Sequence, residues 1–411
     1  MCESASAQFG GEAALPLHYF RVLRSMDVEV WLVAHARTRS ELAALFPDCR
    51  NILFVEDTAF HRWMWRLGRL VPARLSSVTF GFASRLSTQF AARRIARQLV
   101  RREAIDIVHQ PMPVSPKEPS LLHGMGCPVV IGPMNGGMTY PPGFRLSQGV
   151  AERLALAIGR RATNLLSRWM PGKRKAAVLL VANARTRAAL PAGASARVIE
   201  MVENGVDLAS WPVAPSSRPA PDRATRFVFI GRLVDWKAVD CLIDAFALAA
   251  PALPMTLAVI GEGDQRPSLE SLARSKGREV EAAIEFTGWL SQAGCAERLR
   301  DADCLVLPSL YECGGAVVLE AMASGKPVIA TKWGGPADYL DSGSGILVEP
   351  KDRDSFVDGL REAMLGLAAS PATRAELGAR GRAKVIADYD WDRKVVGMLD
   401  VYREAIAGAR S

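Results

Sequence analysis

The chain has 411 residues, of which 49% are hydrophobic and 23% charged, and it carries a net charge of +8 at pH 7. This composition excludes a disordered chain, and the length is enough for two hydrophobic cores. No stretch approaches the roughly 18 apolar residues of a membrane-spanning helix, and the N-terminus lacks the layout of a signal peptide. Seven cysteines without a CxxC pair argue for reduced thiols, and against a disulfide framework or a zinc site. We therefore expect a cytoplasmic protein.

The positive charge is concentrated in the first half of the chain. Residues 1–215 contain 27 Lys and Arg against 15 Asp and Glu, whereas the remaining residues contain 24 against 28. Arginines alternate with Trp, Met, Leu and Phe in "HRWMWRLGRLVPARLSS" and "RATNLLSRWMPGKRKAA". This pattern favours contact with an anionic membrane surface, and a solvated basic helix face is the alternative. We expect no nucleic-acid partner, because no recognised nucleic-acid motif accompanies the charge.

Apolar runs of strand length alternate with helical segments in the first half. The runs are "VEVWLVAH", "NILFVE", "IDIVHQP", "CPVVIGP", "AVLLVAN" and "RVIEMVENG". A strand is also expected before the glycine turn of "CESASAQFGGEAALPLHYF", yet only Met1 precedes Cys2. Either the start codon was placed too late or the first strand is cut short, and we favour the misplaced start codon.

The second half repeats the alternation more regularly. Its apolar runs are "RFVFIG", "MTLAVIG", "IEFTG", "CLVLPS", "PVIAT" and "GILVEP". Buried-type strands that alternate with helices predict an α/β fold with parallel, doubly wound sheets. The segment "WPVAPSSRPAPDRAT" has the composition of a linker. We therefore expect two Rossmann-like domains, at residues 1–215 and 216–385, and a C-terminal helix at residues 386–411 that crosses back to the first.

A turn with two glycines lies between two glutamates in "PSLYECGGAVVLEAMASGKPVIAT". Gly314 and Gly315 fall where a strand gives way to a helix, so that free backbone N–H groups and the helix dipole favour an anion there. Glu312 precedes this turn at the carboxyl edge of the sheet, and Glu320 lies in the helix. Two carboxylates around a phosphate site suit a sugar nucleotide, although two glutamates at this spacing also occur by chance.

A second strand-to-helix turn, in "FIGRLVDWKAVDCLIDAF", carries two cations. Arg232 and Lys237 could neutralise a diphosphate and stabilise it as a leaving group, or they could be ordinary surface residues. The next turn, "AVIGEGDQRPSLE", lacks the third glycine of a dinucleotide fingerprint, which argues against a nicotinamide-dependent oxidoreductase. The strand after it ends in "FTGWLSQ", which places Leu290 at the same edge of the sheet.

Taken together, these motifs resemble the donor domain of the family-4 retaining glycosyltransferases of the GT-B fold. The matching stretches are "GRLVDWK", "VIGEGD", "FTGW", "DADCLVLPSLYECGGAVVLEAMASGKPVIAT" and "GGPADYL". The resemblance implies two Rossmann-like domains that face each other across a cleft, with the C-terminal helix packing back on the N-terminal domain. It also implies retention at the anomeric carbon, without a metal ion or another cofactor.

The resemblance further implies a role for each matching residue. Glu312 is expected to contact the transferred sugar, Glu320 the ribose hydroxyls, and Leu290 the base through its backbone. Arg232 and Lys237 are expected to hold the diphosphate, helped by Gly314 and Gly315. Gly10 and Gly11 of the opposing domain are expected to cap the diphosphate or to open towards the acceptor.

The sequence departs from the family pattern at several positions. Cys313 replaces the phenylalanine that usually follows the first glutamate. Asn135 and Gly136 stand where many relatives have a histidine near the sugar and acceptor, so they are candidate contacts to the acceptor or the sugar. His109 is the nearest histidine along the chain, and it is either a contact to the sugar or acceptor or a structural histidine at a strand end. Asp301 and Asp303 form an Asp-x-Asp pair, which we interpret as boundary residues and not as a metal site.

These observations favour a nucleotide-sugar-dependent hexosyltransferase that uses a UDP- or GDP-linked donor. The expected acceptor is a lipid-linked saccharide, in the assembly of a cell-surface polysaccharide or exopolysaccharide on the inner face of the membrane. A non-catalytic sugar-nucleotide-binding homologue, or a GT-B enzyme with other chemistry such as an epimerase or phosphorylase, is the alternative.

Overall fold

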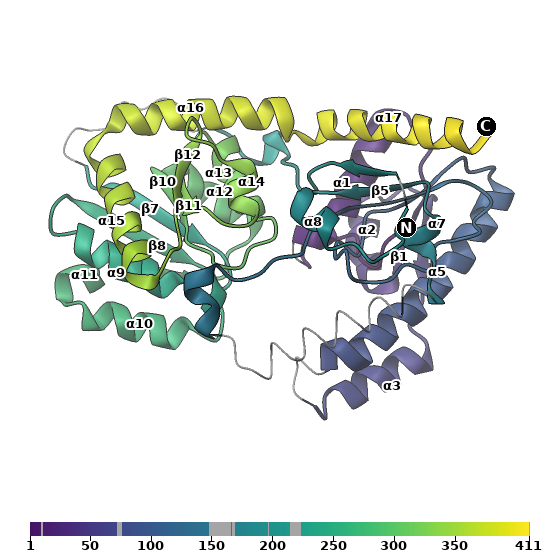
Figure 1. The fold of residues 1–411 in the computed structure, drawn as a ribbon, viewed down its shortest axis with the longest axis horizontal. Coiled ribbons are helices and arrows are strands. Elements are labelled where there is room, and N and C mark those ends of the chain that lie inside the picture. Colours follow the sequence, from purple (N-terminus) through teal and green to yellow (C-terminus); the bar gives the residue numbers. More distant parts are fainter. Residues whose placement is uncertain are drawn as a thin grey trace. The chain divides into compact units, whose positions relative to one another are not determined.

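The computed structural model describes residues 1–9, 11–71, 76–147, 166, 169–195, 197–213 and 223–410 (Figure 1). The described residues form two compact units. Unit 1 comprises Met1–Gly137, Ala151–Glu203 and Lys394–Ser411, and unit 2 comprises Met138–Val150 and Asn204–Arg393. Within the described ranges, no helix is both long enough and apolar enough to cross a bilayer.

Unit 1 contains parallel strands in two groups. β1 pairs with β2, and the other strands follow the order β3-β4-β5-β6. The strands are β1 (Leu32–His35), β2 (Ile52–Val55), β3 (Val108–Gln110), β4 (Val129–Met134), β5 (Val178–Val181) and β6 (Val198–Glu200). The helices are α1 (Gly11–Ser25), α2 (Arg39–Leu45), α3 (Ala59–Gly68), α5 (Phe82–Arg102), α7 (Gly172–Lys175), α8 (Ala184–Ala188) and α17 (Trp391–Arg410). β4 and β5 are buried throughout, as expected for strands covered on both faces.

The first residues of the chain connect the two groups of strands. The Met1 ammonium donates to the carbonyl of His109 in β3 at 2.8 Å, while the Cys2 N–H donates to Val33 O in β1 at 2.9 Å. His35 N in turn donates to Glu3 O at 3.1 Å. The expected first strand is therefore represented by these residues, which lie between β1 and β3.

Unit 2 contains one six-stranded parallel sheet in the order β12-β11-β10-β7-β8-β9. Its strands are β7 (Thr225–Ile230), β8 (Met255–Ile260), β9 (Ile284–Gly288), β10 (Cys304–Leu307), β11 (Val328–Thr331) and β12 (Gly345–Val348). Its helices are α9 (Val239–Ala249), α10 (Arg266–Ser275), α11 (Arg278–Ala282), α12 (Gln292–Asp301), α13 (Ala316–Ala323), α14 (Gly335–Tyr339), α15 (Arg353–Ala369) and α16 (Pro371–Asp388). α9 packs on α15, and α13 packs on β10, β11 and α16 (Figure 1).

The helices of unit 2 begin where the sequence supplies capping residues. Asp352 caps α15 by accepting the Ser355 N–H at 2.8 Å, and Ser370 caps α16 directly before Pro371. Fully buried aromatic side chains from β7, α9 and α15 form the core of the unit. This packing fixes the carboxyl ends of β7 to β10, where the loops of the candidate site begin.

The C-terminal residues expected to form one crossing helix belong to two helices. α16 ends at Asp388, and α17 begins at Trp391 and joins unit 1 from Lys394 onward. On α17, Tyr402 contacts His109 and Glu404 pairs with Arg197, so this helix packs back on the first domain. The chain between residues 204 and 213 groups with unit 2, because Val206 N donates to Tyr389 O at 2.8 Å.

Candidate active site

The loop between β10 and α13 carries the first group of predicted site residues. Gly315 precedes α13 with φ of +81°, a left-handed conformation that favours glycine, and Gly314 is buried beside it. A Cβ on Gly315 would lie 3.1 Å from Glu312 Cγ, so the turn brings the glutamate close to the start of the helix. The first N–H groups of α13 and the Glu312 carboxylate are therefore neighbours, as the sequence predicted.

Lys237 reaches the same loop from a different strand. It ends the short 3₁₀ helix η5 (Asp235–Lys237), which follows β7. Because β7 and β10 are adjacent, η5 and the Glu312 loop meet, and Leu310 N donates to Trp236 O at 2.9 Å. The Lys237 ammonium donates to the Glu312 carboxylate, and both side chains are largely buried, with 14% and 17% exposed. The structure thus joins two residues that lie 75 positions apart in the sequence.

Arg232 lies nearby and faces solvent. Its guanidinium carbon is 5.7 Å from the centre of the Trp236 ring, a cation–π contact. Among the described residues it has no acidic partner, in contrast to Lys237. Arg232 is therefore an uncompensated positive charge at the edge of the sheet, available to an anionic ligand.

The turns after β7 and β8 pack together through their backbones. A Cβ on Gly261 would lie 1.9 Å from Gly231 O, and one on Gly263 would lie 2.1 Å from Leu233 O. Leu233 N donates to Glu262 O at 2.9 Å, which holds the segment between Arg232 and Lys237 in place. The glycines of "VIGEGD" therefore serve close backbone packing between the turns. Leu290 follows β9 and is partly buried.

Glu320 lies within α13, behind the glycine turn. It is partly buried, and burial raises the pKa of its carboxyl to about 7. Among the described residues, its carboxylate has no hydrogen-bond donor or cation as a partner. Hydroxyl groups of a ligand could supply the missing donors, which is the role predicted for this residue.

The turn before α14 completes the site, and its role was not predicted from the sequence. Gly335 N donates to Glu312 O at 2.8 Å. A Cβ on Gly335 would lie 2.1 Å from Gly314 O, and one on Gly334 would lie 2.3 Å from Glu312 O. The glycine pair in "GGPADYL" was a signal for such a close approach, but the pairing partner becomes visible only in the structure.

The residues predicted on the opposing domain lie in unit 1, and their polar groups are engaged there. Asn135 is buried and donates from Nδ2 to Glu203 Oε1 at 2.7 Å. Gly136 N donates to the Thr186 hydroxyl at 3.1 Å, and a Cβ on Gly136 would lie 2.6 Å from Pro116. Both residues thus hold the end of β4 in place, and their predicted role as acceptor contacts stays a prediction.

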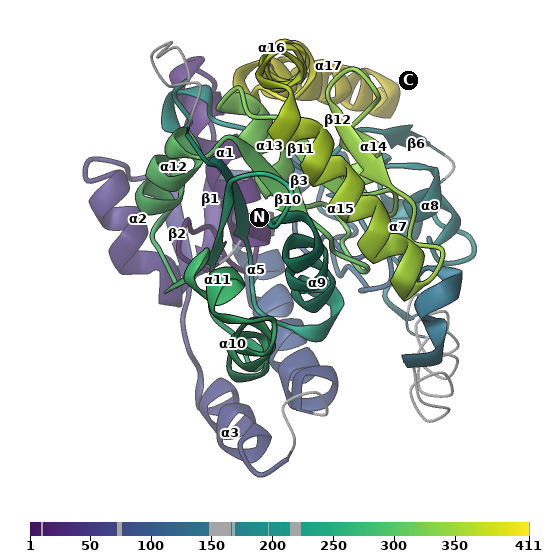
Figure 2. The same ribbon diagram turned by 90° about the vertical axis from the view of Figure 1, so that its left-hand side faces the viewer.

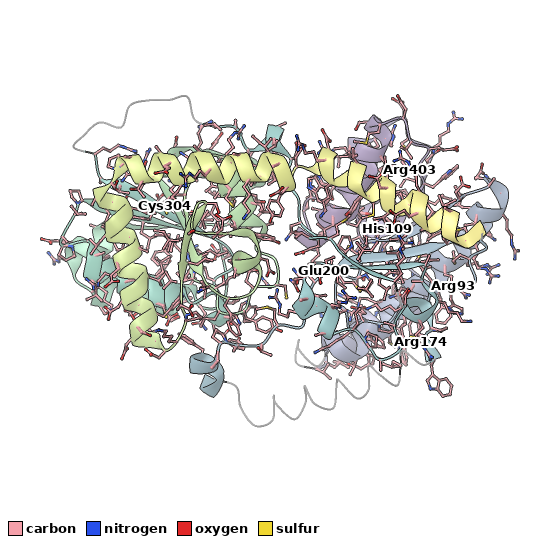
Figure 3. All side chains as sticks on the ribbon, turned by 45° about the horizontal axis from the view of Figure 1, so that its top comes forward. Arg93, His109, Arg174, Glu200, Cys304 and Arg403 are labelled. Atoms are coloured by element: carbon pink, nitrogen blue, oxygen red, sulfur yellow. The ribbon has the colours of Figure 1, made fainter. Side chains whose placement is uncertain are left out.

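His109 lies among the strands of unit 1 and is labelled in Figure 3. Its Nε2 donates to Gly132 O at 2.5 Å, and its Nδ1 accepts from the Tyr402 hydroxyl at 2.7 Å. Burial lowers the pKa of His109 to about 3, so the ring is neutral. Since both nitrogens are engaged, the structural interpretation of this histidine is favoured over contact with a substrate.

Of the two glycines near the N-terminus, Gly11 is the first residue of α1 and is exposed, with open space where its Cβ would lie. Gly10 lies outside the described residues. The Asp-x-Asp pair lies at the opposite, amino edge of the unit 2 sheet, before β10. There Asp303 accepts from Arg226 N at 2.8 Å and from Arg223 at 2.6 Å, so it ties strands together.

The second half of the chain matches a known protein family. A family model described as "Glycosyl transferases group 1" matches residues 224–365, which include β7 to β12 and the Glu312 loop. Glycogen synthase of Mycobacterium tuberculosis is 33% identical over 214 residues, or 52% of this chain and 50% of that protein. D-inositol 3-phosphate glycosyltransferase of Salinispora arenicola is 35% identical over 231 residues, or 51% and 50%. The chain thus spans about half the length of the curated relatives it matches.

Solved structures match almost the whole chain. Anabaena HepE in complex with UDP and glucose has a TM-score of 0.65 at 16% identity, covering 97% of this chain and 98% of that one. Sucrose-phosphate synthase of Thermosynechococcus elongatus has a TM-score of 0.65 at 17% identity, covering 99% and 98%. The predicted fold class, α/β of the GT-B type, is confirmed by this likeness. Residues 224–365 thus match the group 1 glycosyltransferases, and the whole chain has the fold of such enzymes.

Proposed function

We propose that the protein is a retaining, metal-independent hexosyltransferase that uses a UDP- or GDP-linked sugar. The observation that carries this proposal is the contact between Lys237 and Glu312 at the N-terminus of α13, with the exposed Arg232 beside it. Two cations and free helix N–H groups can balance a diphosphate, and a carboxylate next to them can accept hydrogen bonds from a sugar. The relatives support this donor class: HepE binds UDP, and a relative from Corynebacterium glutamicum is GDP-mannose-dependent.

The residues divide the work of the transfer as follows. Arg232 and Lys237 stabilise the negative charge that develops on the leaving diphosphate as the bond between it and the anomeric carbon breaks. The acceptor hydroxyl forms its new bond on the same face of the sugar, and its proton passes to an oxygen of the departing phosphate. Glu312 orients the transferred sugar, Glu320 accepts from the ribose hydroxyls, and the backbone near Leu290 borders the base.

The proposed acceptor is a lipid-linked saccharide, and the proposed setting is the cytoplasmic face of the membrane during polysaccharide assembly. Support comes from α3, which stands away from the strands of unit 1 (Figures 1 and 2). Phe60, Trp63 and Trp65 of this helix are 42%, 58% and 65% exposed. Arg62 lies between Phe60 and Trp63 in the sequence, and Arg66 directly follows Trp65. Exposed aromatic side chains with interspersed arginines suit the interface of an anionic bilayer.

The donor is tested by thermal unfolding with UDP-, GDP- and ADP-sugars, with NAD and NADP as controls. A ligand that binds only the folded state stabilises it by about 2.7 kcal/mol at a hundredfold excess over Kd. We expect a raised midpoint with UDP- or GDP-sugars, together with slow nucleotide release from the same donor. Stabilisation without any nucleotide release in the presence of membrane lipid extract would indicate a non-catalytic homologue, and a response to NAD alone would contradict the proposal.

The membrane contact is tested separately with vesicles. The protein should sediment with vesicles that contain anionic phospholipid and remain free with zwitterionic vesicles. The double variant Trp63→Ala with Trp65→Ala should lose most of this binding, whereas the control Leu248→Ala, which removes an exposed apolar side chain of unit 2, should keep it. Equal binding by both variants would contradict a role for α3.

A further inference from the structure

A segment that follows β4 in the sequence belongs to unit 2. Residues from Met138 onward leave β4 and group with the second compact unit. Gly143 lies against the backbone of Lys351, since a Cβ there would come within 1.6 Å of Lys351 O. The ring of Phe144 packs edge-on against Phe356, with 6.0 Å between the ring centres. The segment is therefore anchored on unit 2 at its far end.

The near end of this segment meets the Glu312 loop. The indole N–H of Trp333 donates to Thr139 O at 2.7 Å. The rings of Tyr140 and Tyr311 lie 5.2 Å apart with 34° between their planes. Tyr311 directly precedes Glu312, and Trp333 directly precedes the glycine pair that closes on Glu312. Three aromatic side chains thus gather at the loop that carries Glu312.

The aromatic group is only partly covered by protein. Tyr311 is 37% exposed, and Tyr140 and Trp333 are partly exposed. A hexopyranose ring offers an apolar C–H face to an aromatic ring and hydroxyl groups at its rim, so aromatic side chains next to a carboxylate match both of its surfaces. A purely apolar ligand would make no use of the Glu312 carboxylate, which accepts from the Lys237 ammonium and has room for further donors.

We propose that Tyr140, Tyr311 and Trp333 form a subsite that binds the sugar ring of the acceptor. This inference rests on the proposed function, because the acceptor hydroxyl must reach the anomeric carbon of the sugar that Glu312 orients. Of the three residues, Tyr311 directly precedes Glu312 in the loop, and its side chain is exposed to solvent. The subsite assigns acceptor recognition to three aromatic residues that the sequence analysis did not single out.

The test measures sugar binding apart from transfer. Methyl glucopyranosides, mannopyranoside and galactopyranoside are added to the protein saturated with UDP or GDP, and binding is followed by saturation-transfer difference NMR. We expect a signal from at least one glycoside in the wild type. Tyr311→Ala should reduce it at least about fivefold, and Tyr311→Phe, which keeps the ring, should retain it. The thermal shift with the nucleotide should be the same in all three proteins.

A control variant separates a lost subsite from a loosened segment. Phe144→Leu weakens the anchor on Phe356 and leaves the three aromatic rings in place, so it should keep the glycoside signal. Absence of a signal in the wild type, retention of it in Tyr311→Ala, or equal losses in Phe144→Leu and Tyr311→Ala would each overturn the subsite. A protein that fails to bind any nucleotide would instead contradict the proposed function.

Discussion

The carboxyl ends of the strands differ between the two units in how their polar groups are used. In the described part of unit 2, Arg232 faces solvent without an acidic partner, and the charged groups of Lys237 and Glu312 pair with each other. In unit 1, the side chains of Asn135 and His109 are engaged by other residues of that unit. Side chains that hold a fold together are satisfied internally, whereas those that bind a ligand retain capacity for it. The comparison therefore supports the proposed donor site in unit 2.

The largest effect is expected from a substitution of Glu312, at the carboxyl edge of the unit 2 sheet. Glu312→Gln keeps the size of the side chain and removes the negative charge beside the transferred sugar. We expect transfer to fall by at least about 100-fold, as for other groups that act at a developing charge, while the thermal shift with the nucleotide persists. Nucleotide release from the donor is the measurement. A wild-type rate of release would contradict a role for Glu312 in transfer.

Lys237→Ala should weaken both steps. Removing an ammonium that binds the diphosphate costs about 1.5–3 kcal/mol of binding free energy, or roughly 10- to 150-fold in affinity. The rate of transfer should fall as well, because the same ammonium stabilises the leaving diphosphate. Calorimetric titration with the nucleotide sugar gives the affinity. Lys276→Ala is the matched control. Lys276 pairs with Asp244, with 2.7 Å between its ammonium and the carboxylate, and neither residue belongs to the Glu312 loop. This variant should therefore leave the affinity unchanged.

For unit 1 the expected effect is on stability. Asn135→Ala leaves the buried Glu203 without one of its hydrogen-bond donors, which costs about 1–3 kcal/mol of unfolding free energy. The control Asn51→Ala removes a weaker hydrogen bond, of 3.4 Å, from the same unit and should cost less. Thermal unfolding measures both, and nucleotide binding should be unchanged. A variant of Asn135 with full stability and no transfer would assign this residue to the acceptor site instead.

Glu320 predicts a pH dependence of donor binding. Burial raises the pKa of this carboxyl to about 7. In the protein without ligand, the Glu320 carboxyl is therefore mostly protonated at pH 6 and mostly ionised at pH 8. Ribose hydroxyls donate to the ionised form, so the affinity for the nucleotide sugar should increase about tenfold from pH 6 to pH 8. Titration calorimetry at both values measures this, and Glu320→Gln should remove the dependence. The same raised pKa makes folding less stable as the pH rises from about 4.5 to 7.

The smallest effect is expected from relieving backbone strain at an alanine in each unit. Ala238 and Ala104 both have φ of +49°, a left-handed conformation that disfavours a Cβ. Ala238→Gly and Ala104→Gly should each stabilise the protein by about 0.5–1 kcal/mol. Thermal unfolding measures the gain. Since Ala238 follows Lys237, only its variant should alter the thermal shift with the nucleotide, and an equal change in both would contradict this.

The sequence by itself determined the strands of unit 2, the fold class and the candidate residues at the carboxyl edge of the unit 2 sheet. The apolar runs from "RFVFIG" to "GILVEP" correspond to β7 to β12, because a parallel strand buried on both faces must be apolar along its length. The turn at Gly314 and Gly315 was also visible, since Gly315 takes a left-handed conformation, with φ of +81°, that favours glycine. Local composition is enough for such features.

Only the tertiary structure decided which residues meet. Lys237 and Glu312 touch because β7 and β10 are neighbours in the sheet, an order that the sequence of strands does not reveal. His109 is held by a helix nearly 300 residues later, and Tyr140 packs on Tyr311 although its segment follows a strand of unit 1. These contacts depend on strand order and on chain crossings between units, which long-range packing fixes and local patterns do not encode.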